Sequence, residues 1–362
     1  MHERLMNGVM VLLAVVAAAE LAYAFATRKP VHTLRDTLSS VSLGIGQQAI
    51  NAYLAASFLA VYEWVHANWA PIHADRSVVW HWALLIVACD FCYYVGHRTS
   101  HNVNFWVAAH IVHHQAEDFN HLSAFRQSWT AWMVMFPFFL PLALFGVPVD
   151  MFVIGQMGIM CIQFLSHNGA FRGQLGMLDR LLVTPANHRV HHGINGPYLG
   201  ANCGGMFVIW DRVFGTFVEE DPNIPIRMGS GIRMNFYDPF EANVDYYRRL
   251  WTVARHRRGL GKLTLWFQSP RVLKQELMAL GRRDVGEPLV RDPLSPRGRL
   301  AAGAALAACV ALLAVHRASF DGNPVALRLL TGASVLFALG VLGRLLSGPG
   351  AVNPAVSTAA AK

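Results

Sequence analysis

Apolar residues occur along this chain in runs long enough to form helices that cross a membrane. Such runs cover 8–27, 41–65 and 78–95, and two more lie near the C-terminus at 300–315 and 326–342. About 20 apolar residues in a helix span roughly 30 Å of hydrocarbon. The run at 8–27 also resembles a signal peptide, but the acidic Glu20 interrupts its apolar core, which favours a retained span.

A longer apolar stretch covers 129–162 and is broken only at 146–150, where a glycine and a proline stand close together. Glycine and proline between two apolar segments indicate a turn. The pattern therefore predicts a transmembrane hairpin of two helices over 129–166.

Composition restricts the class of protein further. Hydrophobic residues make up 54% of the 362 residues, charged residues only 14%, and the mean hydropathy is +0.33. A soluble domain carries about a quarter charged residues, so the chain is expected to be an all-α integral membrane protein. The expected organisation is N-terminal transmembrane helices at 1–76, a catalytic core at 77–222, a basic membrane-surface region at 223–298, C-terminal transmembrane helices at 299–346 and a disordered tail at 347–362.

The net charge of +8 indicates the orientation in the membrane. Basic residues follow the apolar runs at 28–29, 98 and 172–189, and most of the others lie in 227–299. The positive-inside rule then places these segments in the cytoplasm, and in a bacterium the membrane is the inner one. Within the basic region, 240–260 alternates aromatic and basic residues, which suits a helix in the headgroup plane or, equally, a domain helix with a solvated basic face.

Histidines are concentrated in one part of the chain. Ten of the 17 lie between positions 97 and 192, and most of these form three motifs: GHRTSH, HIVHH and HRVHH. Histidines three or four residues apart share one face of a helix. Neutral imidazole is a good ligand for iron, zinc and copper, so these faces are expected to converge on metal. Eight imidazoles exceed what one ion binds, which implies two metal ions.

The motifs and their context resemble the fatty acid hydroxylase and sterol desaturase superfamily. The stretches DFCYYVGHRTSHNVNFWVAAHIVHHQAEDFN, SAFRQS, TPANHRVHHG and IWDRVFGTF are similar to its alkylglycerol monooxygenase branch, and the similarity covers roughly residues 80–220. The fold expected from the spans and charges is several transmembrane helices capped by a cytoplasmic helical domain. The resemblance implies a di-iron centre, held by histidines, that uses O2 on an unactivated lipid C–H bond. It also implies the metal ligands His97, His101, His110, His113, His114, His167, His188, His191 and His192.

Two further residues are candidates for a role at the site. Asp90 lies two helical turns before His97, and a carboxylate inside a span is a functional candidate, here to orient a ligand imidazole. Asn202 aligns with a family asparagine that would complete the metal shell. Two positions depart from the branch, with Asn102 where it has Glu and Asn187 where it has His, while His121 has no family counterpart and is expected to lie behind the ligands or at the surface.

Several activities are compatible with this pattern. The first is hydroxylation of a sterol, alkylglycerol, ornithine-type or acyl lipid, and a desaturase on the same centre is the nearest alternative. A membrane zinc hydrolase would use the metals to activate water. A metal transporter is disfavoured because the motifs lie at the ends of spans and not at the midplane. No haem motif, flavin loop or ferredoxin cysteine set occurs, so electrons are expected from a separate cytoplasmic donor protein, with a pterin requirement and the oligomeric state left open.

Overall fold

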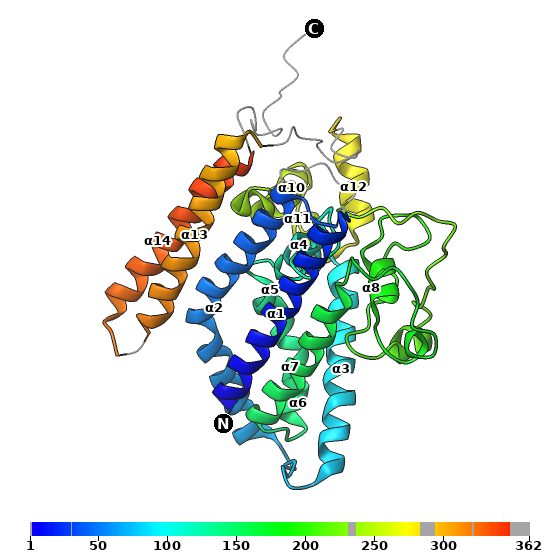
Figure 1. Ribbon diagram of the computed structural model, residues 1–362. Coiled ribbons are helices and arrows are strands. Elements are labelled where there is room, and N and C mark those ends of the chain that lie inside the picture. Colours follow the sequence, from blue (N-terminus) through cyan, green and yellow to red (C-terminus); the bar gives the residue numbers. More distant parts are fainter. Residues whose placement is uncertain (1, 30, 231–236, 283–293, 321, 348–362) are drawn as a thin grey trace.

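The computed structural model describes residues 2–29, 31–230, 237–282, 294–320 and 322–347 (Figure 1). The regular secondary structure of these residues is helical, apart from one isolated bridge between Leu182 and Phe207. The helices are α1 (His2–Thr27), α2 (Leu34–Trp69), α3 (Val79–Asn102), α4 (Asn104–His114), η1 (Ser123–Phe125), α5 (Ala131–Met135), η2 (Phe136–Phe139), α6 (Leu140–Leu144), α7 (Val149–Ser166), η3 (Leu178–Arg180), α8 (Pro185–His192), α9 (Ile209–Val213), α10 (Pro239–His256), α11 (Gly261–Phe267), α12 (Pro270–Ala279), α13 (Pro296–Ala318) and α14 (Val325–Ser347).

Four of these helices are long and apolar enough to cross a membrane, namely α3, α7, α13 and α14. On α3, one stripe of apolar side chains faces outward at Leu84, Val87, Phe91 and Val95. Spacings of three and four residues place these side chains on one side of the helix. The chain is thus an all-helical integral membrane protein, as predicted, and we expect this outward stripe of α3 to face lipid.

The predicted hairpin over 129–166 has a span-length helix only in its second half, α7. Its first half consists of α5, η2 and α6, because Pro137 and Pro141 lack the amide hydrogen that a continuous helix requires. The turn lies where it was predicted, with Gly146 in the left-handed region at φ 78°. A Cβ at Gly146 would overlap the carbonyl oxygen of Ile72, so only glycine fits this turn.

Two apolar cores hold the bundle together. In one, α13 and α14 pack against α2 through Cys309, Val335, Leu339 and other buried side chains. In the other, the far half of α2 packs against α3, α6 and α7, with Tyr62 stacked on Phe152 at 4.6 Å between ring centroids. Figure 1 shows the α13–α14 pair on one side of α2 and the loops around α8 on the opposite side of the molecule, next to α3.

Helix α4 turns back from the end of α3 and is covered by α10, α11 and α12. Asn104 fixes this turn, since its side chain donates to the Leu265 carbonyl at 2.8 Å and accepts from the Tyr246 hydroxyl at 2.8 Å. The predicted 240–260 helix is α10, and its buried face packs Leu250 against Val107 of α4. The α10 helix therefore positions the second histidine motif.

Of the predicted tail, 348–362 lies outside the described residues.

Helix α2 passes so close to residues 128–130 that Gly46 has no space for a side chain. A Cβ at Gly46 would lie 2.3 Å from Nε1 of Trp129, and that nitrogen already donates to the Leu43 carbonyl at 3.2 Å. We expect Gly46→Ala to destabilise the protein by about 1–3 kcal/mol through overpacking. Thermal unfolding of the detergent-purified protein measures this effect. Gly303→Ala is the matched control, because nothing lies within 4 Å of its Cβ position; equal unfolding temperatures for the two variants would contradict this packing.

Candidate metal centre

The nine predicted ligand histidines come together in the structure from four segments of the chain. The end of α3 supplies His97 and His101, and α4 supplies His110, His113 and His114. His167 follows the last residue of α7, and α8 supplies His188, His191 and His192. Helix α8 is short but well defined at its start, where Pro185 occupies the first turn and the Thr184 side chain accepts from the Asn187 amide.

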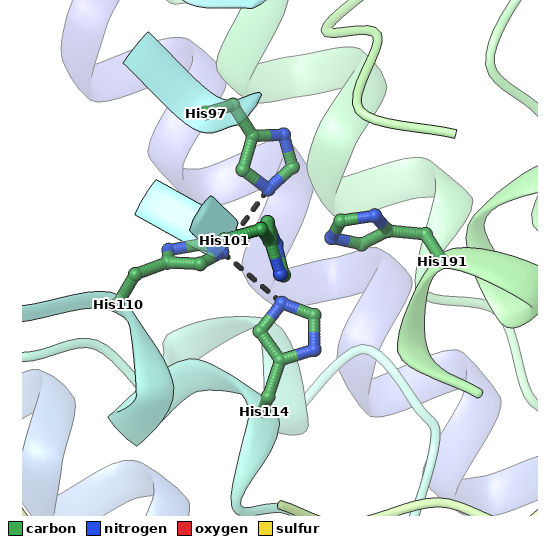
Figure 2. Close-up of side chains that lie close together, drawn as sticks. All are labelled: His97, His101, His110, His114 and His191. Atoms are coloured by element: carbon green, nitrogen blue, oxygen red, sulfur yellow. Dashed lines mark hydrogen bonds between the residues drawn. The ribbon is translucent and has the colours of Figure 1, made fainter. Parts of the chain in front are cut away.

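The nine imidazoles form two adjacent groups. The first group contains His97, His101, His110, His114 and His191, and the second contains His113, His167, His188 and His192. Within each group, one ring nitrogen from each histidine lies within 4.8 Å of all the others. Figure 2 shows the first group, with rings from α3, α4 and α8 pointing toward a common centre. Two groups of this size and composition can each hold a metal ion.

Backbone carbonyls determine which ring nitrogen is left for a ligand bond. Nδ1 of His97 lies 2.9 Å from the Cys203 carbonyl, and Nδ1 of His191 lies 2.9 Å from the Ala201 carbonyl. In the second group, Nδ1 of His113 and of His167 approach the carbonyls of Arg126 and Gln163. A carbonyl accepts only from a protonated Nδ1, so each of these rings presents an unprotonated Nε2. Such orienting bonds are typical of histidines that bind metal.

A bound metal ion explains the arrangement of the facing Nε2 atoms better than hydrogen bonds between the rings do. In the first group, Nε2 of His110 lies 3.1 Å from Nε2 of both His97 and His114, although one N–H satisfies only one neighbour. Nε2 of His101 and of His191 are buried without a hydrogen-bond partner among the described residues. Nitrogens bound to one ion at about 2.0–2.1 Å lie roughly 2.9–3.4 Å apart, which agrees with these separations.

The second group repeats this arrangement around His188. Its Nε2 lies 3.2 Å from Nε2 of His167 and 3.2 Å from Nε2 of His192. Burial lowers the pKa of His113 in this group, and of His191 in the first group, to about 4. Both rings are therefore neutral near pH 7, the form in which imidazole binds metal.

Asp90 has a different role from the one predicted. Instead of orienting an imidazole, its carboxylate accepts hydrogen bonds from the amides of Met206 and Phe207 at 2.6 and 3.1 Å and from Trp210 Nε1 at 3.0 Å. The segment that it holds is close in sequence to Cys203, whose carbonyl orients His97. Asp90 thus acts on the site through the backbone that precedes α9.

Asn202 also lies behind the ligands and not among them. Its backbone is left-handed at φ 55°, and its side chain bonds the carbonyls of Asn187 and Val218 and the Val218 amide. All its side-chain bonds in the described structure go to backbone groups, and its completion of the metal shell stays a prediction. Asn102 and Asn187 likewise bond nearby carbonyls, those of Arg98 and of Asp179 and Leu182.

Gln163 connects the two groups and was not predicted from the sequence. Its backbone carbonyl faces Nδ1 of His167, and its side-chain amide donates to the carbonyls of Gly204 (3.3 Å) and Gly205. Those glycines directly follow Cys203, the residue that orients His97. A glutamine in an apolar helix, one turn before a histidine, is the signal that could have identified it.

Arg126 is a second residue with a structural role at the site. Its carbonyl faces Nδ1 of His113, while its fully buried guanidinium bonds the Val112 carbonyl at 3.1 Å and Ser39 of α2 at 3.0 Å. His121, in contrast, lies outside both groups. It is buried against Glu20 of α1, with its Nδ1 2.8 Å from the Glu20 carboxylate.

Comparison with known proteins matches this region to one family model and to several relatives. Residues 82–216 match the fatty acid hydroxylase family model, and this segment contains all nine histidines. Alkylglycerol monooxygenase of Xenopus tropicalis is 32% identical over 66% of this chain and 52% of its own length, and the Homo sapiens enzyme is 31% identical over 67% and 54%. Ornithine lipid hydroxylase of Rhizobium tropici is 30% identical over 41% of this chain and 44% of that protein.

The chain spans about half the length of the alkylglycerol monooxygenases that it matches. No solved structure matches significantly. The resemblance read from the three histidine motifs is confirmed, because the matched region begins before the first motif and ends after the last.

The position of Gln163 between the two groups leads to a prediction. Gln163→Ala removes the bonds to Gly204 and Gly205, and we expect metal affinity to fall about 10- to 100-fold, as it does when orienting partners are lost. Metal content after dialysis against a series of chelator concentrations measures this loss. Gln156→Ala is the control, because Gln156 lies two turns earlier on the same helix and contacts Cys89 instead. A loss of equal size in both variants would mean that a general weakening of α7 is the cause.

Proposed function

We propose that this chain, whose residues 82–216 are a fatty acid hydroxylase domain, is an O2-dependent di-iron monooxygenase that hydroxylates a C–H bond of a membrane lipid. The observation that carries this proposal is the pair of imidazole groups inside the protein. One contains five histidines and the other four, and in each group the ring nitrogens point toward a common centre. When bound, two iron ions would supply the activation of O2.

The protein's own contribution is to hold and shield these ligands. The carbonyls of Cys203, Ala201, Arg126 and Gln163 keep the imidazoles in the tautomer that leaves Nε2 free. The imidazoles are buried or nearly so, which keeps water away from the reacting lipid carbon. A structural zinc site uses four ligands and often cysteine, whereas these groups consist of histidine alone.

The depth of the site in the membrane indicates which part of a lipid reacts. His97 and His101 lie in the last two turns of α3, and His167 directly follows α7, so both groups lie where spans end. A lipid carbon near the headgroup reaches this level more easily than the end of an acyl chain. We infer a substrate that is oxidised near its polar end, such as an alkylglycerol or an ornithine lipid, the lipids named for the relatives.

We further infer that the site faces the cytoplasm of a bacterium, across the inner membrane. Basic residues gather on the side where α3 ends, including Arg98 of α3 and Arg248, Arg249, Arg255 and Arg257 in and after α10. This distribution agrees with the positive-inside rule. A cytoplasmic electron-donor protein would then reach the site directly.

The two groups predict distinct ligand variants. His191→Ala removes a ligand from the first group and His113→Ala from the second, and we expect each to lower bound iron from two ions toward one and to reduce activity more than about 100-fold. Iron is measured by elemental analysis of protein expressed with iron supplied and zinc limited.

Two further histidines serve as controls for these variants. His256 bonds only the Thr252 carbonyl one turn earlier among the described residues, so His256→Ala should keep both ions and full activity. His121→Ala removes the Glu20 contact, and we expect lower thermal stability with the iron retained. Iron loss in all four variants would disprove the assignment of these ligands.

The activity itself is tested with an ether lipid, its ester-linked counterpart and an ornithine lipid. The full chain, loaded with iron and supplied with a reducing system, is incubated with an alkylglycerol, the matched ester-linked acylglycerol and an ornithine lipid under isotopically labelled O2. We expect one labelled oxygen atom in the product of the ether lipid or the ornithine lipid. A product that lacks two hydrogens would indicate a desaturase, and turnover without O2 on zinc-loaded protein would indicate a hydrolase.

A further inference from the structure

Exposed apolar side chains form a patch on the loops beside α3, outside the metal centre. The patch, which we call the lip, consists of Met177, Leu178, Leu181, Ile209, Val213 and Phe214. Met177 and Val213 are 66% and 65% exposed. An apolar surface shared by two loops that are distant in sequence commonly marks a binding surface.

The two halves of the lip form one unit. Leu182 pairs with Phe207 in the isolated bridge, the Val183 amide donates to the Met206 carbonyl at 2.9 Å, and the Val208 amide donates to the Leu181 carbonyl at 3.2 Å. These bonds place the loop at 175–182 directly beside α9. The lip is thus a fixed surface and not a set of separate side chains.

The lip is attached to the lipid-facing side of α3. Phe91, a member of the outward stripe on α3, packs on Trp210 at 4.8 Å and on Phe214 at 6.4 Å between ring centroids. Tyr94, one turn further along α3, stacks on Phe214 at 5.4 Å. The apolar stripe of a membrane-spanning helix therefore continues without a break onto the lip.

The attachment point lies below the end of the span. Asp90 and Phe91 precede Arg98 by about two turns, or roughly 10–12 Å of helix. We place the headgroups at the level of Arg98, because it is the first arginine or lysine along α3 and basic residues gather at the ends of spans. Its guanidinium bonds the Tyr94 hydroxyl and lies 5.8 Å from the centre of the Phe214 ring. The part of α9 that docks at Phe91 is thus at the depth of the acyl-chain carbons nearest to the headgroups.

Irregular backbone at this depth requires partners within the protein, because lipid supplies none. The Asp90 carboxylate meets this requirement for the amides of Met206 and Phe207 and for the indole of Trp210. The buried carboxylate of Asp211 does the same for the amides of Cys203 and Gly204 at 2.8 Å each. Both carboxylates accept hydrogen bonds from amides of the loop on its protein side, so apolar side chains can occupy its outward side.

We propose that the lip is immersed in the leaflet on the histidine side and that acyl chains of membrane lipids cover it. Arg212 projects beside the lip and lies over the Phe217 ring at 4.0 Å, where it can pair with an anionic headgroup. This inference depends on the chain being a membrane protein and not on its catalytic activity or its metal.

Photolabelling tests this placement directly. The full chain is placed in nanodiscs of phosphatidylcholine and phosphatidylglycerol that contain a phospholipid with a diazirine in its acyl chain, and labelled residues are mapped by mass spectrometry. We expect the lip to be labelled as strongly as residues 84–95 of α3. Leu199 is the internal control, because it is 66% exposed on a neighbouring loop outside the lip and should remain unlabelled.

A matched pair of variants and a second probe complete the test. Val213→Asp should lower lipid labelling of the lip at least about threefold, since a carboxylate is costly in hydrocarbon, whereas Leu199→Asp should not change it.

A water-borne diazirine probe is applied to the unaltered chain, so the outcome does not depend on the folding of a variant. Labelling of the lip by the water-borne probe alone would overturn the proposal in favour of a surface for a soluble partner. Protection from both probes would overturn it in favour of contact between two copies of the chain.

Discussion

Hydrogen bonds from imidazole Nδ1 atoms to backbone carbonyls are the constraint on which the centre depends. They fix the tautomer of His97, His113, His167 and His191 and leave each Nε2 free to bind a metal. The carbonyls belong to loops and to the last turn of α7, so the ligand geometry follows from how those loops are held. That explains why side chains that never face a metal, those of Gln163 and Arg126 above all, reach into the backbone around the two groups.

The membrane and the metal centre are joined through a small number of buried polar groups. Asp90 on α3 holds the segment before α9, and Glu20 on α1 binds the amides of His121 and Gly169, the second of which lies two residues beyond His167. A carboxylate inside an apolar helix is costly unless several donors surround it. Each of these acids has at least two, so each stabilises a loop that carries or orients a ligand.

The ligand set could be read from the sequence because spacings of three and four residues describe one face of a helix, and all three motifs lie on helices or at their ends. The four apolar spans could be read for a similar reason, since length and composition decide them, whereas the runs at 8–27 and 41–65 lie in α1 and α2, which are not among the four. The orienting carbonyls could not be predicted, because every residue has a backbone carbonyl and the sequence does not indicate which one faces an imidazole. Asp90 and Asn202 were singled out from the sequence, but their hydrogen-bond partners were not predicted, since those partners lie in loops whose path depends on tertiary contacts.

Helices α13 and α14 pack mainly against α2 and α10, and among the described residues they contribute no member to either histidine group. Polar links join the pair to the bundle as well: His316 is fully buried and bonds Thr331 of α14 and the Ala49 carbonyl of α2, and the Tyr53 hydroxyl of α2 donates to the Arg328 carbonyl of α14. The pair therefore anchors the bundle apart from the histidine groups. We expect changes in its exposed apolar residues to alter how the protein fits its membrane and to leave the chemistry of the histidine domain unchanged.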